Sequence, residues 1–395
     1  MNLPADRLIK KIFVTAECVR DEIVEQIFTA YPKQKKIAIE SEKSLTETIP
    51  QEDPKKILLV THSKGEVVKD CPGTAAPYLC CRYQVINQTL NCPLNCTYCI
   101  LQYYLNQPAT IIYTDYQKII AEIEQKITSQ PHRLLRFGTG ELGDSLALTA
   151  SQIFAIKLIG YFATQKNALL ELKTKTDRIG LILDQPHNGH TVISWSLNPL
   201  VIRNSEERLA PPPTRRLKAA AEAARRGFLI GFHFDPIIDI PDWENQYLDL
   251  IEELYHYVDP ARIAWISLGS LRFPPSMKTK IIARYPYSRL PYGELIRGQD
   301  QKMRYPRPRR TEIYRSIYRK LTEIREPPFV YFCMESPTVW QDVCGFAPQS
   351  NAHLDYLFAE SLARRFPGLV AIKPKLPVYE NAAGGCSAVK NNPDY

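Results

Sequence analysis

The chain has 395 residues, 45% of them hydrophobic, and carries a formal net charge of +8. This length suits one large α/β domain with appendages or two ordinary domains, and the hydrophobic content is sufficient for a packed core. The charged N-terminal segment lacks the apolar stretch of a signal peptide, and no run approaches the roughly 18 apolar residues of a membrane span. We therefore expect a cytoplasmic protein without a membrane segment, whose ten cysteines serve metal ligation or redox chemistry rather than disulfides.

Residues 1–80 are predicted to form an N-terminal α/β extension. Strand-like segments lie at residues 11–16 and 56–61. The stretch between them is polar and rich in Lys and Glu, so we expect it to be solvated and poorly packed.

Residues 81–270 alternate between strand-like and helix-like segments, which is typical of a parallel α/β layout. Asp115 and Asp242 stand where they can cap helices, and Gly227 can end a helix over residues 214–226. Six strands are predicted, at residues 83–90, 133–138, 168–174, 191–198, 228–235 and 262–268. Six β/α units predict a partial (β/α)6 TIM-like barrel, open on one side, with its chemistry on the loops after the carboxyl ends of the strands.

Three cysteines, Cys92, Cys96 and Cys99, directly follow the first predicted strand in the run CPLNCTYC. Thiolates this close in sequence can hold three irons of a 4Fe-4S cluster and leave the fourth iron open to a non-protein ligand. S-adenosylmethionine would chelate that iron, so the spacing indicates radical chemistry. Further cysteines lie upstream, at Cys71, Cys80 and Cys81. They leave a zinc site open as the alternative.

The loop after the second strand, GTGELGDS, runs over residues 138–145. Its glycines let the backbone approach a ligand, and the carboxylates of Glu141 and Asp144 could receive the ammonium group of a bound methionine moiety. An ordinary tight β/α connection is the alternative. The position of the loop behind the cysteine run favours cofactor binding.

Polar side chains share one face of the third, fourth and fifth strands near their carboxyl ends. Because parallel strands usually have both faces covered, this polar face predicts a binding pocket, with solvated faces as the alternative. Asn198 and Asp235 are assigned to cofactor binding on this basis. The polar sets are Glu171, Lys173 and Lys175, then Ser194, Ser196 and Asn198, and finally His233 and Asp235.

These segments resemble the radical S-adenosylmethionine enzymes, and within them the spore photoproduct lyase family, over roughly residues 71–318. The resemblance implies that the three cysteines ligate the cluster, and that Asp144, Lys175 and Ser196 contact S-adenosylmethionine. Tyr98 matches a tyrosine that lies between two ligands. Further anchors are Cys99-Ile-Leu-Gln102, Arg136-Phe137, Thr174-Lys175, His187-Asn188-Gly189, Ser196-Leu-Asn198, Asp235-Pro236 and Asp242-Trp243.

The implied mechanism is reductive cleavage of S-adenosylmethionine to a 5'-deoxyadenosyl radical, which abstracts hydrogen from the substrate. In the lyase this opens a thymine dimer, a C–C lyase reaction. An electron donor of the flavodoxin or ferredoxin type would reduce the cluster.

Two positions differ from the lyase pattern. The cysteine that returns hydrogen in the lyase is here Glu141, and the tyrosine after the third ligand is here Ile100. Tyr98 and Glu141 are therefore the candidate catalytic residues. Either another group, such as Tyr98 or one of Cys80 and Cys81, supplies the hydrogen, or the chain catalyses a different reaction. In an extended segment the two adjacent cysteines would point in opposite directions, so at most one would face the site.

Residues 271–395 are predicted to form a basic C-terminal region. Residues 272–320 hold 14 Lys and Arg against three Asp and Glu, a local net charge of +11 (14 minus 3) that exceeds that of the whole chain. Cations neutralise phosphates, and the interleaved tyrosines can stack on unpaired bases, so this segment predicts contact with nucleic acid. A merely solvated basic face is the alternative.

Three functions remain open from the sequence. The chain is a radical enzyme acting on DNA like a photoproduct lyase, a radical enzyme acting on a protein or small molecule, or a nucleic-acid-binding Fe-S protein without radical catalysis. Release of 5'-deoxyadenosine separates the first two from the third. Salt-dependent DNA binding separates the second from the others.

Overall fold

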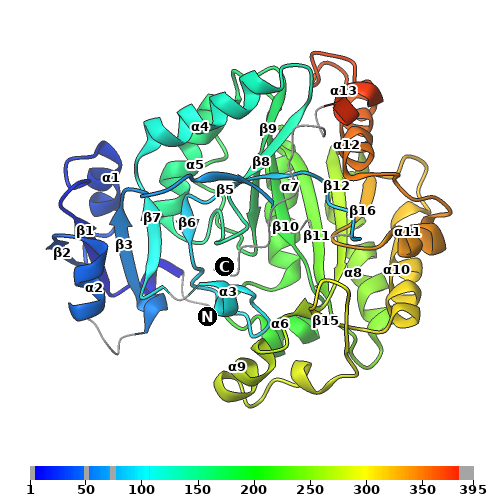
Figure 1. Ribbon diagram of the computed structural model, residues 1–395, viewed down its shortest axis with the longest axis horizontal. Helices are drawn as coiled ribbons and strands as arrows, with labels where there is room; N and C mark the ends of the chain where they lie inside the picture. The colour runs from blue at the N-terminus through cyan, green and yellow to red at the C-terminus, as the bar shows by residue number, and fades with distance from the viewer. Residues whose placement is uncertain (1–4, 49–52, 72–76, 106, 382–395) are drawn as a thin grey trace.

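The computed structural model describes residues 5–48, 53–71, 77–105 and 107–381. In these residues the strands form a smaller sheet near the N-terminus, a large curved sheet, and a short antiparallel ribbon (Figure 1). One hydrophobic core runs through both larger sheets, from Ile12 and Leu58 in the smaller to Phe137 and Leu170 in the large one. The N-terminal extension is therefore packed against the rest of the molecule.

The smaller sheet is parallel except at its last strand. Its order within the described residues is β2 (Lys35–Ile39), β1 (Lys11–Thr15), β3 (Ile57–Thr61), β7 (Thr110–Tyr113) and the antiparallel β6 (Thr89–Leu90). The two strands predicted here are confirmed as β1 and β3. The prediction of a solvated, poorly packed stretch between them is wrong for helix α1 (Glu22–Ala30), whereas residues 32–44 are exposed or half-buried as expected. Helix α1 buries Ile23 and Ile27, whose i,i+4 spacing puts both on one face.

The large sheet is a half-barrel, and it contains all six strands predicted for the core (Figure 1). The first of them is shorter than predicted, because the chain leaves the large sheet after Ile86 and enters the smaller one at Thr89. In the described part of the chain the order is β16 (Phe329–Phe332), β12 (Ile263–Ser270), β11 (Leu229–Ile237), β10 (Thr191–Ser196), β9 (Ala168–Thr174), β8 (Leu135–Gly138), β5 (Gln84–Ile86) and the antiparallel β4 (Val68–Asp70).

Helices cover the half-barrel: α5 (Thr149–Phe162) packs on β9, and α7 (Pro213–Arg225) packs on β10 and β11. Asp115 and Asp242 stand at the N-caps of α4 (Tyr116–Ser129) and α8 (Trp243–Tyr257) as predicted, but neither side chain makes a capping hydrogen bond. Asp115 instead accepts a hydrogen bond from Ser63 Oγ at 2.8 Å, and Asp242 adopts a left-handed backbone without a capping bond. Gly227 ends α7 as predicted, with φ of 92°. The remaining helices are α2 (Glu42–Thr48), α3 (Leu101–Tyr104), α6 (Leu200–Glu206), α9 (Met277–Arg284), α10 (Arg307–Thr322), α11 (Pro337–Cys344), α12 (Asn351–Arg365) and α13 (Leu376–Asn381), with 3-10 turns at Ala5–Arg7, Pro54–Lys56, Pro260–Arg262 and Leu290–Tyr292.

The large sheet continues past residue 270, where the sequence suggested a division. β16 pairs in parallel with β12 from Trp265–Phe329 to Leu268–Phe332. The antiparallel ribbon, β13 (Arg272–Phe273), β15 (Met303–Arg304) and β14 (Ile296–Arg297), follows β12. The C-terminal region thus contributes a strand to the barrel sheet. Among the described helices, none has the length and apolarity to cross a bilayer.

Candidate active site

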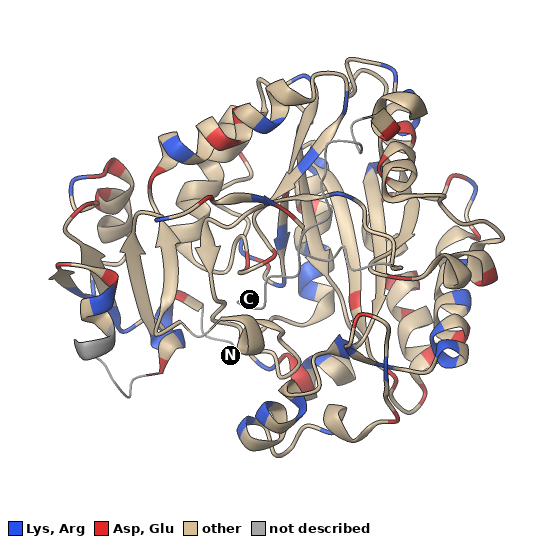
Figure 2. Ribbon diagram, in the orientation of Figure 1, with Lys and Arg blue, Asp and Glu red and all other residues tan. Residues whose placement is uncertain are grey.

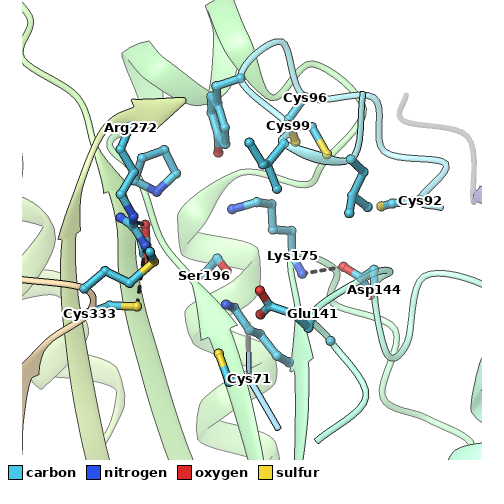
Figure 3. A pocket seen from close by; sticks show the side chains of 18 of the residues that line it. Cys71, Cys92, Cys96, Cys99, Glu141, Asp144, Lys175, Ser196, Arg272 and Cys333 are labelled. Carbon is cyan, nitrogen blue, oxygen red and sulfur yellow. Dashed lines mark hydrogen bonds and ion pairs between the residues drawn. The ribbon is translucent and has the colours of Figure 1, made fainter. Parts of the chain in front are cut away.

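A cavity of about 300 Å³ lies at the carboxyl ends of the half-barrel strands (Figure 3). It collects residues from the cysteine loop and from the ends of β8 to β11. Of the site residues assigned from the sequence, Asn198 alone does not line it. The others are Cys92, Cys96, Tyr98, Cys99, Glu141, Asp144, Lys175, Ser196 and Asp235.

The cysteine loop is fixed by hydrogen bonds along its length. Left-handed backbone at Asn95, with φ of 55°, turns the chain between the first two cysteines, and Tyr285 donates to Asn95 Oδ1 at 2.6 Å. Thr97 N donates to the carbonyl of Glu206 at 3.0 Å, and Gln102 Nε2 donates to the carbonyl of Thr97 at 2.9 Å. These bonds hold the three thiols toward the cavity.

The donor set suits an iron-sulfur cluster better than one metal ion. Among the described residues, no three His, Cys, Asp or Glu side chains converge closely enough for a single ion. A cluster binds each thiolate on a different iron, which suits three thiols spread along one wall. Burial, the largest cause, raises the pKa of Cys96 to about 12. The thiol is therefore protonated in the absence of iron, and binding to iron would displace its proton.

Asp144 clamps the loop after β8 to the end of β9. Its carboxylate accepts from Thr174 Oγ1 at 2.7 Å, from Leu146 N at 3.0 Å and from Lys175 N at 2.8 Å (Figure 3). Most of its acceptor capacity is therefore used inside the fold. Glu141, in contrast, makes no hydrogen bond with any described residue and faces the cavity, so it is the freer carboxylate of this loop.

A buried carboxylate that the sequence did not single out, Glu207, lies beneath the cysteine loop. It accepts hydrogen bonds from the Tyr98 hydroxyl, from Asn198 Nδ2 at 3.0 Å and from Arg216 at 2.6 Å. Lys175 Nζ lies 3.3 Å from Oε1, the same oxygen that accepts from Tyr98 and Asn198. Burial would raise the pKa of Glu207, but Lys175 and Arg216 lower it, so the carboxylate stays charged. Asn198 belongs to this network rather than to the cavity wall.

The polar face of the strands divides into two levels. Lys173, Lys175, Ser196 and Asp235 line the cavity. Below them, Glu171, Ser194 and His233 form a buried network in which Glu171 accepts from Ser194, from His233 Nε2 at 2.8 Å and from Trp265 Nε1 at 3.1 Å. Solvated faces, the alternative from the sequence, are excluded because these side chains are buried or half-buried.

Four further cysteines line the wall opposite the cysteine loop; Figure 3 shows two of them, Cys71 and Cys333. Both Cys80 and Cys81 face this cavity, so the expectation that at most one would do so is wrong. The two thiols hydrogen-bond to each other, so they do not point in opposite directions. Seven of the nine described cysteines therefore line one cavity. Three belong to the cysteine loop, and the other four are Cys71, Cys80, Cys81 and Cys333.

The thiols of this second set differ in protonation. Hydrogen bonding to Cys71 and Cys81, followed by burial, raises the pKa of Cys80 well above its usual range. A hydrogen bond from Cys80 and the charge of Arg136 lower the pKa of Cys81 to about 6, against the effect of burial. Cys80 and Cys81 thus form a hydrogen-bonded pair of thiols on this wall, in which Cys80 holds its proton the more tightly.

Positive charge in residues 272–320 is partly neutralised inside the fold. Arg272 binds Asp235 at 3.0 Å, and Arg310 binds Glu335 at 2.8 Å. The outward charge is therefore smaller than the composition suggested, although Figure 2 shows Lys and Arg along α9 and α10. Some exposed cations make no ion pair within the described residues: Lys278, Arg284, Arg289, Arg297 and Arg307.

An open half-barrel whose C-x3-C-x2-C loop and strand ends line one cavity defines the class of radical S-adenosylmethionine proteins. Comparison with known families specifies the class further. The family model described as spore photoproduct lyase matches residues 80–325, more than half of the chain. The chain belongs to the spore photoproduct lyase family.

Individual relatives are distant. A spore photoproduct lyase of a Geobacillus species is 27% identical over 206 residues, and that of Bacillus subtilis is 27% identical over 207 residues. Each match covers 51% of this chain and 60% of the relative's own length. A solved spore photoproduct lyase mutant with bound AdoMet and dinucleoside spore photoproduct superposes with a TM-score of 0.73 at 22% identity, over 82% of this chain and 98% of that chain, which establishes the shared fold.

Proposed function

We propose that the chain is a radical S-adenosylmethionine enzyme that repairs a thymine photoproduct in DNA. The observation that carries the proposal is the single cavity that joins the cysteine loop to the polar ends of β8 to β11. A related fold holds both AdoMet and a dinucleoside photoproduct in a solved structure, which supports a cavity of this kind for both.

Within this cavity the roles divide by wall. Cys92, Cys96 and Cys99 would hold the 4Fe-4S cluster, and Lys175 and Ser196 would contact S-adenosylmethionine. When bound, the reduced cluster and S-adenosylmethionine supply a 5'-deoxyadenosyl radical. Asp144 keeps the two strand ends together, while Glu141 offers an unengaged carboxylate to the ammonium group of the cofactor.

The hydrogen that the product needs would come from the opposite wall. Glu141 has no S–H bond, whereas Cys80 keeps its proton and faces the cavity. Tyr98 is less suited, because its hydroxyl is already bound to Glu207. We therefore assign hydrogen return to Cys80: its S–H bond breaks, a C–H bond forms on the substrate, and sulfur keeps the unpaired electron.

The decisive experiment gives dinucleoside spore photoproduct to the anaerobically reconstituted chain with dithionite and S-adenosylmethionine. The expected products are thymines and 5'-deoxyadenosine, and Cys96→Ala should yield neither. An intact cluster that releases no 5'-deoxyadenosine would refute radical catalysis. Cofactor cleavage without repair would favour the second candidate, a radical enzyme acting on a protein or small molecule, which the replacement of the lyase cysteine by Glu141 permits.

A matched pair of variants tests the hydrogen donor. Cys80→Ala should continue to release 5'-deoxyadenosine but divert the opened substrate to by-products. Cys344→Ala removes a thiol outside the cavity and should leave the product ratio unchanged. Identical product ratios in both variants would assign hydrogen return to another group.

A further inference from the structure

A second cavity, of about 580 Å³, adjoins the first. The end of β11 separates them, because Asp235 and Pro236 line the first cavity while Ile238 and Asp239 line the second. Glu206, on the wall of the second cavity, also binds Thr97 of the cysteine loop. A polymer whose reacting unit occupies the first cavity would therefore bring a neighbouring unit to the second.

The second cavity has an aromatic ring supported by a cation. Tyr287 lines it and is 45% exposed. The guanidinium of Arg208 lies 3.7 Å from the centroid of that ring, and Arg208 is not among the cavity-lining residues, so it supports the ring from outside. Tyr285 packs edge-on against Tyr287, with centroids 6.1 Å apart. The ring is thus held in place while remaining accessible.

Charge and polarity complete the site. Arg289 lines the cavity, is exposed, and makes no side-chain hydrogen bond or ion pair with the described residues. Asp239 is neutralised by Arg309, which binds its two oxygens at 2.7 and 2.9 Å. Two further carboxylates line the cavity: Glu206, which accepts hydrogen bonds from Thr97 and Ser288, and Glu294, which is exposed, so a phosphate would have to lie on the Arg289 side. The rest of the lining is largely apolar, formed by Ile202, Ile240, Pro241, Leu290, Tyr305 and Pro306. A flat aromatic group attached to a phosphate matches this combination.

We propose that the second cavity binds an unpaired nucleobase adjacent to the lesion, stacked on Tyr287, with its phosphate near Arg289. This inference rests on the proposed function, because it assumes a DNA substrate whose lesion enters the first cavity. Bases drawn out of a duplex are commonly received by aromatic side chains, which stack on any base without reading its sequence. A longer substrate would therefore bind more tightly than a dinucleotide.

The test compares a single-stranded oligonucleotide, carrying the photoproduct beside 2-aminopurine, with the isolated dinucleoside photoproduct. In Tyr287→Ala the Kd of the oligonucleotide, from fluorescence anisotropy, should rise roughly tenfold, and the quenching of 2-aminopurine should be lost. Turnover of the dinucleoside should keep its kcat and KM. Tyr287→Phe should behave like the parent, and so should Tyr292→Ala, which removes a ring that is 63% exposed but does not line the cavity.

Two results would overturn the subsite: an unchanged Kd for the oligonucleotide in Tyr287→Ala, or an equal loss for the dinucleoside. If the thermal midpoint of unfolding of Tyr287→Ala equals that of the parent, the rise in Kd is due to weaker binding and not to unfolding of the variant. If the parent chain does not turn over the dinucleoside, the proposed function fails, yet the oligonucleotide Kd and the quenching still decide the subsite.

Discussion

At the scale of single residues, Glu207 connects the parts of the candidate site. It binds Tyr98 in the cysteine loop, Lys175 at the end of β9, and Arg216 on α7. The side chains of Glu207 and Arg216 are fully buried. A buried charge is tolerated only when paired, so each partner depends on the others.

Replacing this carboxylate should cost more stability than removing one of its partners. In Glu207→Gln, Arg216 and Lys175 lose their counter-ion, and we expect the free energy of unfolding to fall by about 3–5 kcal/mol. In Tyr98→Phe the carboxylate keeps its cations, and the expected loss is about 1.5–3 kcal/mol. Urea denaturation of both variants measures the difference. Equal losses in the two variants would show that the hydrogen bonds of Glu207, and not its pairing with Lys175 and Arg216, supply most of its contribution to stability.

Glu171 makes the stability of the half-barrel depend on pH. Burial would raise the pKa of Glu171, but His233 and Ser194, to which it hydrogen-bonds, lower it to about 2. In the unfolded chain the pKa is about 4.3. The stabilisation is therefore complete above about pH 4.3 and is lost as the pH falls toward 2, by roughly 3 kcal/mol in total.

The comparison of parent and Glu171→Gln measures this contribution. The stability difference between them, from urea denaturation at several pH values between 2 and 7, should shrink as the pH falls below about 4.3. A difference that is constant over this range would contradict the assignment.

Residue positions differ in how far sequence alone could predict them. Lys175 and Ser196 follow from strand alternation, because a period of two fixes the face of every residue in a strand. Glu207 lies in the link between two helices, where no periodicity applies. Cys333 follows β16, and its place beside the cavity depends on a pairing between distant segments.

At the scale of elements, α9 covers the cysteine loop. It lies beside α3, as Figure 1 shows, and Lys280 Nζ stands 5.7 Å from the ring centroid of Tyr103. Lys278 and Arg284 point to solvent, and α9 contains no acidic residue. We propose that this basic helix, beside the α3 that follows the cysteine loop, would dock the acidic electron donor of the flavodoxin or ferredoxin type expected from the sequence.

Charge reversal on α9 should slow electron delivery without affecting the cluster. For Lys278→Glu with Arg284→Glu, we expect reduction by an acidic flavodoxin at low salt to slow roughly tenfold. Reduction by dithionite, which needs no docking, should be unchanged. The matched control, Arg315→Glu with Arg319→Glu on α10, makes the same charge change elsewhere. If both pairs slow the flavodoxin equally, net charge rather than α9 is responsible.

At the scale of the whole molecule, the C-terminal region is part of the barrel. A boundary was predicted at residue 270 because the chain becomes strongly basic after it. Composition indicates the charge of the surface, however, and does not indicate which strands pair. β16 is only four residues long, and such a short apolar run is a weak signal for a strand. The six predicted strands were recognisable because each lies in a β-rich run with a turn or helix on either side.

A chain that stops at residue 270 should therefore not fold. It would lose the partner of β12, leaving Trp265 and Ile266 at an open edge. It would also lose Arg272, so Asp235 would remain unpaired in the cavity. We expect the fragment to show no cooperative urea transition by circular dichroism. A cooperative transition in the 1–270 fragment would show that the half-barrel is independent of the region that follows it.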